Sequence, residues 1–299
     1  MPGFTGMRQN SATVAVLSGK GGTGKTLVSV NLAAAAEKAA YVDCDVEEPN
    51  GHLFFQPEIR NEEVVSLKIP VIDESRCTGR RACVDFCRFN ALAFIKGKPF
   101  VFPSVCHSCG GCALVCPSGA IRETGKPVGV VRRGISGGVT VHTGALNPGE
   151  ASGVPLIRRL LRQSEQEPLP LRIIDCPPGS ACAVMESIQD ADYCLIVTEP
   201  TIYGAHNLAM VHELVTLFQK PYGVVLNKCS DGDNRSEEYC LKHGVPVIGR
   251  IAFSPQLGML ASEGKIAARE SAEYAGLFRD LLNTVIGEVR NEETSASQR

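Results

Sequence analysis

The chain carries the segment GKGGTGKT at residues Gly19 to Thr26. It matches the pattern G-x4-G-K-[ST], in which backbone amides hold phosphate groups, the lysine reaches the outer phosphates and the hydroxyl binds Mg²⁺. A short β-branched run, residues 13–18 (TVAVLS), precedes the segment, and an alanine-rich stretch with high helix propensity, residues 26–40, follows it. A strand, a glycine loop and a helix in this order predict a nucleotide-binding α/β domain.

Further along the chain, apolar β-branched runs alternate with helical stretches. We expect strands at residues 40–45, 138–146, 171–175, 193–198, 222–227 and 246–253, and helices at 154–166, 205–220 and 272–289. This alternation predicts βαβ units and a mostly parallel sheet flanked by helices on both faces. The last helix is expected to pack on the sheet, because its polar face is mixed in charge, whereas a membrane-binding helix has a basic one.

Composition narrows the class of protein. The 299 residues carry a net charge of −2, which gives no bulk electrostatic support for a nucleic-acid or anionic-membrane partner. No apolar run is long enough to span a membrane, and the N-terminal residues 1–13 lack the order of a secretory signal, so we expect a short disordered lead. Thirteen cysteines in a chain with a phosphate-binding loop indicate metal-bound thiolates in a reducing cytoplasm, not disulfides.

The loop contains a second lysine, Lys20. In this respect KGGTGKT resembles the deviant Walker A loop of the MinD/ParA/Mrp group of P-loop ATPases, which includes the nitrogenase iron protein. The resemblance covers about residues 13–50 and 129–289. It implies ATP hydrolysis in a face-to-face homodimer, with Lys20 reaching the nucleotide of the partner and Lys25 the nucleotide of its own chain. The implied ATP-binding loop residues are Gly19, Lys20, Gly21, Gly22, Thr23, Gly24, Lys25 and Thr26.

Two acidic segments resemble the switches of the same group. By resemblance, Asp45 in VDCDVEEPN orients the attacking water, and Asp43 lies near the Mg²⁺ that Thr26 binds. In IIDCPPG, Asp175 would hold Mg²⁺ through water and Gly179 would sense the γ-phosphate. Asn227 stands where the group has an asparagine that contacts adenine; a structural asparagine at a strand end is the alternative.

A cluster of seven cysteines interrupts the ATPase pattern. Its second half, Cys106-x2-Cys109-x2-Cys112-x3-Cys116-Pro117, has the spacing of bacterial ferredoxins, in which three cysteines bind one iron–sulfur cluster and the fourth binds the other. Zinc would require two separated CxxC pairs. The first half departs from the ferredoxin pattern, because Arg80 stands where its second cysteine would be.

Crossed ligation divides these cysteines into two sets. The four-ligand set, expected to hold a [4Fe–4S] cluster, comprises Cys87, Cys106, Cys109 and Cys112. The three-ligand set comprises Cys77, Cys83 and Cys116. A [3Fe–4S] cluster, a labile [4Fe–4S] cluster and no cluster are the alternatives there, since arginine is a poor iron ligand. Four arginines form a basic group that is either solvated surface or a docking site for an acidic redox partner: Arg76, Arg80, Arg81 and Arg88.

We therefore expect an ATPase domain in two parts, residues 1–58 and 128–299, with an α+β ferredoxin-like domain inserted at 59–127. The leading hypothesis is an ATPase whose nucleotide-dependent dimerisation is coupled to electron transfer or cluster handling with a redox or iron–sulfur protein. The alternatives are an iron–sulfur cluster carrier and a MinD/ParA-like spatial regulator. An amidotransferase-type synthase is excluded, because no length remains for a glutaminase domain. The C-terminal half has no CxxC pair, which weakens assignment to the scaffold ATPases of cluster assembly.

Overall fold

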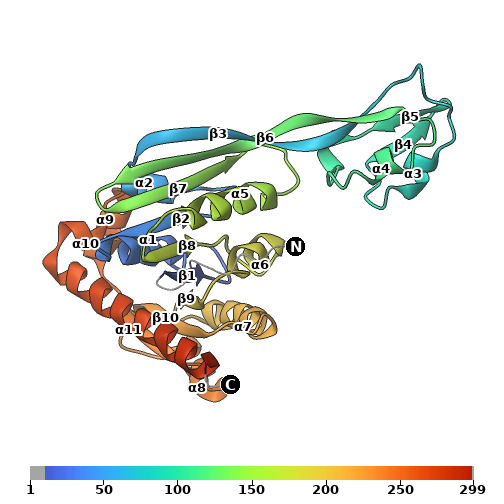
Figure 1. Cartoon of the computed structure of the whole chain (residues 1–299). Helices are drawn as coiled ribbons and strands as arrows, with labels where there is room; N and C mark the ends of the chain where they lie inside the picture. The colour runs from blue at the N-terminus through green and yellow to red at the C-terminus, as the bar shows by residue number, and fades with distance from the viewer. Residues whose placement is uncertain (1–10, 298–299) are drawn as a thin grey trace.

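The computed structural model describes residues 11–297, with side chains through residue 291. Most of the expected N-terminal lead, residues 1–10, lies outside this range. Figure 1 shows a layered α/β body from which a long two-stranded ribbon extends to a small cysteine-rich unit. The ribbon and this unit are formed by residues 58–136, so they interrupt the body in the sequence.

A nine-stranded sheet forms the centre of the body, in the order β11-β10-β9-β1-β8-β2-β7-β6-β3. The first seven strands in this order run parallel. Their bounds are β1 Ala12–Leu17, β2 Ala39–Asp43, β7 Val139–Leu146, β8 Leu171–Asp175, β9 Tyr193–Thr198, β10 Tyr222–Cys229 and β11 Val247–Ala252. The prediction of a mostly parallel α/β sheet is confirmed.

Helices cover both faces of the sheet. Alternate residues of each strand point to opposite faces, so each strand contributes to two cores. In β1, Val14 and Val16 join a core with helices α1 (Lys25–Ala35) and α11 (Ala272–Ser297). Ala15 and Leu17 join a second core with α5 (Val154–Glu165), α6 (Cys182–Ile188) and α7 (Ile202–Leu217). The expected packing of the last helix on the sheet is confirmed, since Phe278 and Val285 are fully buried.

The remaining helices of the body are short. They are α2 (Gly51–Phe55), α8 (Arg235–His243), α9 (Pro255–Ser262) and α10 (Ala267–Glu270). Helix α9 follows β11 and lies beside the glycine loop, where its Leu257 contributes to the wall of a cavity described below.

Strands β3 (Glu58–Ile72) and β6 (Ile121–Ser136) pair antiparallel along their whole length. From Gly129 onward β6 also pairs with β7, so residues 129–136 belong to the sheet, while residues 121–128 pair only with β3. The segment expected as an insertion, 59–127, thus begins and ends inside strands. This differs from the expectation because β3 contains five charged side chains and a proline, and its apolar alternation is limited to Val65, Leu67, Ile69 and Val71.

The cysteine-rich unit, residues 73–120, closes the far end of the ribbon (Figure 1). It contains α3 (Ala82–Phe86), a hairpin of β4 (Leu92–Ile95) and β5 (Lys98–Val101), and α4 (Gly111–Leu114). The small core at this end of the molecule comprises Cys83, Leu92 and Cys112 of the unit and Ile121 of β6. Two of these four residues are cysteines, so the packing of the unit centres on its thiols.

Candidate functional site

The glycine loop joins β1 to α1 and lines a cavity of about 410 Å³. Gly22 and Gly24 have φ angles of 81° and 94°, a region that favours glycine. At Gly24 a side chain is also excluded by space, since a Cβ atom would lie 2.1 Å from Nδ2 of Asn227. The Thr23 hydroxyl is buried and has no hydrogen-bond partner within the described chain. A loop with these features at a helix N-terminus suits a phosphate group.

Lys25 lies in a buried network at the edge of this cavity. Its ammonium group donates a hydrogen bond to Oδ1 of Asp175 at 2.7 Å, and the Tyr41 hydroxyl donates to Oδ2 at 2.8 Å. Burial alone would lower the pKa of Lys25, but the carboxylates of Asp175, Asp43 and Asp45 together outweigh it and the net shift is upward. The cation at the loop is therefore paired with the carboxylate at the end of β8.

The two aspartates of the first acidic segment lie beside this pair. Asp43 is buried at the end of β2, and its Oδ2 accepts from the Gly51 amide at 2.9 Å. Burial, together with Asp175, raises the pKa of Asp43 to about 8. Asp45 lines the cavity, and burial also raises its pKa. Oxygen ligands of this kind suit Mg²⁺, whose charge would relieve the crowding of carboxylates.

Lys20 is held by its own chain. Its ammonium group pairs with the carboxylate of Glu199, whose side chain is only 13% exposed. Lys228 lies 3.6 Å from the other oxygen of Glu199 and donates to the Gly22 carbonyl at 2.7 Å. Glu199 and Lys228 were not among the residues expected from the sequence. Glu199 follows β9, the neighbour of the loop strand β1, and Lys228 lies near the end of β10, the next strand along the sheet. Charged residues at such carboxyl ends are a usable signal.

The remaining predicted residues of this site also meet at the loop. The Asn227 amide donates to the Thr23 carbonyl at 2.7 Å, so in this structure it supports the loop while lining the cavity. The Gly179 amide donates to the Ser18 carbonyl at 2.8 Å, which places the second acidic segment beside the loop. The apolar wall of the cavity was missed: Phe253, Leu257 and Ala261 form it.

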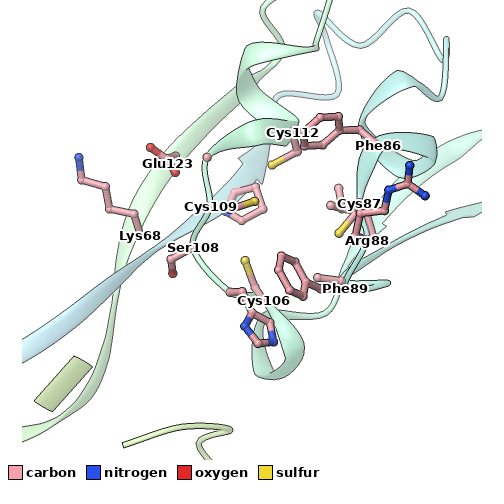
Figure 2. Close-up of a pocket in the computed structure, with 15 residues that line it drawn as sticks. Lys68, Phe86, Cys87, Arg88, Phe89, Cys106, Ser108, Cys109, Cys112 and Glu123 are labelled. Atoms are coloured by element: carbon pink, nitrogen blue, oxygen red, sulfur yellow. The ribbon is translucent and has the colours of Figure 1, made fainter. Parts of the chain in front are cut away.

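Four cysteines surround a second cavity, at the junction of the ribbon and the cysteine-rich unit. Its lining includes Cys87, Cys106, Cys109 and Cys112, the same four that crossed ligation groups together. Figure 2 shows their sulfur atoms directed toward one shared space. The cavity measures about 200 Å³, many times the ~10–15 Å³ of this measure that one water molecule requires.

The chemistry of this cavity fits an iron–sulfur cube. Its walls are largely apolar, with Phe86 and Phe89 at its side, and burial raises the pKa of the Cys112 thiol to about 11. A thiol in such surroundings ionises readily only when a metal takes up its charge. The ribbon adds two charged residues to the lining, Lys68 from β3 and Glu123 from β6 (Figure 2).

The other three cysteines, Cys77, Cys83 and Cys116, line a separate cavity with Arg80. It measures only about 20 Å³, room for roughly one water molecule, so the three thiols do not fit a cluster without rearrangement. Over the described residues, no three His, Cys, Asp or Glu side chains are close enough to bind a single metal ion.

Comparison with known proteins places the body in a family. Residues 14–267 match the model of the CobQ/CobB/MinD/ParA nucleotide binding domain, and the chain belongs to this family. It is similar to an uncharacterized protein of Methanocaldococcus jannaschii, with 30% identity over 237 residues, 78% of this chain and 83% of that protein. An iron-sulfur cluster carrier protein of Pyrococcus horikoshii is 24% identical over 93% of this chain and 86% of its own length.

A solved structure supports the same fold. The cell division ATPase MinD of Pyrococcus furiosus aligns with a TM-score of 0.57 and 18% identity, over 93% of this chain and 99% of that chain. None of the described helices is both long and apolar enough to cross a membrane.

Proposed function

We propose that this protein is an ATPase that binds a [4Fe–4S] cluster and couples the state of its nucleotide to electron transfer with a redox partner. One observation carries the proposal: the thiols that crossed ferredoxin ligation groups together converge on one cavity, in a chain whose body has a complete nucleotide pocket. The family membership supports the nucleotide half of the proposal.

In the nucleotide half, the glycine loop and Lys25 hold the phosphates, and Thr26, Asp43 and Asp175 hold Mg²⁺ directly or through water. Asp45 orients a water molecule that attacks the γ-phosphorus. The bond between this phosphorus and the oxygen that bridges it to the β-phosphate breaks, and ADP and inorganic phosphate leave. Lys20 leaves Glu199 and reaches the nucleotide of a second copy in an ATP-dependent homodimer, where its charge stabilises the transition state.

In the thiol half, Cys87, Cys106, Cys109 and Cys112 bind as thiolates and fix the position of the cluster. The cluster supplies a centre that accepts and releases one electron. Phe86 and Phe89 limit the access of water to this cavity, and the exposed Arg88 beside it favours an acidic partner surface. In the described chain Arg88 has no ion-pair partner.

The test is to purify the protein without oxygen and to measure iron, sulfide and ATP hydrolysis on one sample. We expect about four iron and four sulfide per chain from the four-thiol cavity, an electron paramagnetic resonance signal on reduction, and hydrolysis that Lys25→Ala abolishes. Zinc in place of iron, or a chain that does not bind ATP, would contradict the proposal.

A cluster carrier is the second candidate. A relative from Pyrococcus horikoshii that is 24% identical to this chain is named an iron-sulfur cluster carrier protein, which supports this candidate. Incubation with an apo-ferredoxin separates the two candidates. A carrier loses iron to the acceptor on the timescale of ATP turnover, whereas a redox ATPase retains it.

A further inference from the structure

The ribbon has a defined root. Strand β6 gains its second neighbour, β7, only where Gly129 lies opposite Leu146. At the same level the pairing of β3 with β6 shifts register between Val65 and Ser66. A bulge bends a strand and weakens its ladder, so a bulge at the point where three paired strands become two is a natural hinge.

Val46 lies against this root. It follows Asp45 directly, is 2% exposed, and its carbonyl accepts from the Leu146 amide at 2.8 Å. Two glycines leave room for its side chain. A Cβ atom on Gly153 would lie 2.5 Å from Cγ2 of Val46, and one on Gly144 would lie 3.1 Å from Cγ1. Val46 therefore fills a close-fitting socket.

The loop after β7, residues 147–153, contacts both the socket and the ribbon. The Asn147 amide donates to the Val128 carbonyl at 2.9 Å, and the Asn147 side chain donates to the Pro127 carbonyl at 3.3 Å. Glu150 forms an ion pair with Lys126 at 2.8 Å. Gly153, at the other end of the same loop, forms part of the Val46 socket.

We propose that Val46 transmits movement of the nucleotide pocket to the ribbon, so that the cysteine-rich unit changes position with the nucleotide. Asp45 lines that pocket, and its backbone cannot shift without moving Val46. Interior packing is dense, so a displaced side chain moves its neighbours instead of compressing them. The loop 147–153 then carries the movement to Val128 and to the bulge. This inference rests on the proposed nucleotide binding.

The experiment measures the distance between the cysteine-rich unit and the body. Fluorophores are attached to p-acetylphenylalanine at Leu114 and Leu241, because both side chains are exposed and the thirteen cysteines preclude thiol labels. Energy transfer is compared with and without Mg²⁺ and AMPPNP. Iron content and nucleotide affinity are measured on the same samples, so that failure of the proposed function is recognised separately.

We expect Val46→Ala to bind AMPPNP within about threefold of wild type and to lose more than about half of the nucleotide-dependent change in transfer. The matched control is Val224→Ala in β10, a buried valine of the same core near the opposite edge of the sheet, which should keep the full change. An unaltered response in Val46→Ala, or no response in the wild type despite bound nucleotide, would overturn the inference.

A second pair of variants tests the contact between Val46 and Gly153 by changing Gly153. Gly153 has an ordinary φ of −78°. Among the described residues, apart from its chain neighbours, an added Cβ would meet only Val46. Gly153→Ala should therefore change the transfer efficiency without nucleotide. Adding Val46→Ala should return it toward the wild-type value, because the clash disappears. If the second substitution gives no such rescue, Gly153 does not act through Val46 and the inference fails.

Discussion

At the scale of single residues, the ion pair between Lys20 and Glu199 makes dimerisation less favourable, because the pair has to break when the dimer forms. A partly buried ion pair of this kind is worth about 1 kcal/mol, which Lys20 gives up when it reaches a second nucleotide. Glu199→Gln should therefore lower the ATP concentration for half-maximal dimer formation by roughly fivefold. Light scattering during gel filtration measures this.

The matched control is Glu48→Gln, a carboxylate of the same cavity that has no ion pair within the described chain. Lys20→Ala should abolish ATP-dependent dimerisation and hydrolysis. Equal ATP requirements for Glu199→Gln and the wild type, or full activity in Lys20→Ala, would argue against a role for Lys20 across the interface.

The cysteines give a second prediction at this scale, based on crossed ligation. Cys87→Ser should remove about four iron atoms per chain, although Cys87 lies in the first half of the motif. Cys116→Ser should leave the four-thiol cluster intact, although Cys116 ends the ferredoxin run, because its thiol lines the other cavity. Iron analysis checks both, and the reverse pattern would contradict the assignment of the two sets.

His142 predicts an acid limit to stability. The side chain is fully buried in β7, and burial lowers its pKa to about 4, against the opposing effect of Glu167 at 3.6 Å. Unfolded chains bind the proton near pH 6.5, so the stability that neutral His142 contributes is present above that pH and is lost as the pH falls toward 4. The loss by pH 4 should be about 3 kcal/mol.

The variant His142→Gln lacks this titration. The difference in unfolding free energy between wild type and variant should therefore decrease from pH 7 to pH 4, as chemical denaturation can measure. A difference that is constant over this range would mean that His142 titrates alike in the folded and unfolded chains.

At the scale of elements, the ribbon is an addition to a body that is complete without it. Val65 and Gly129 are partners in the register of β3 and β6, so a two-residue Asn-Gly turn can join them in place of residues 66–128. The shortened chain should fold and bind ATP as the full chain does, and should contain no iron. Loss of nucleotide binding after this replacement would show that the body depends on the unit.

Much of the body was predictable from the sequence because its signals are local. Strands β8 (Leu171–Asp175) and β9 (Tyr193–Thr198) begin and end where their apolar runs do, since both faces of a parallel strand are buried. The glycine loop and the ferredoxin spacing are equally local, and their residues meet in the structure as the patterns suggest.

The ribbon and the Lys20 partner were not predictable in this way. In β3 the apolar alternation is limited to Val65, Leu67, Ile69 and Val71, and Pro70 within this run weakens it as a strand signal. Glu199 meets Lys20 only because β9 lies next to β1, a neighbourhood set by the order of the strands and not by distance along the chain. Spacing also does not reveal that the three-thiol cavity is small.

At the scale of the whole molecule, the two candidate sites are well separated. Figure 1 shows the cysteine-rich unit at the far end of the ribbon, away from β1 and α1, which the glycine loop joins. The nucleotide and the thiol cavity therefore cannot touch within one chain. Coupling between them has to pass through the ribbon or through a second copy, and by linkage it acts in both directions.

In the proposed function, nucleotide and redox states influence each other. The most direct test is the midpoint potential of the four-thiol cluster, titrated with electron paramagnetic resonance in Mg·ADP and in Mg·AMPPNP. We expect a shift of tens of millivolts, with ~59 mV for a tenfold difference in nucleotide affinity between the oxidised and reduced protein. The same potential with both nucleotides would contradict it.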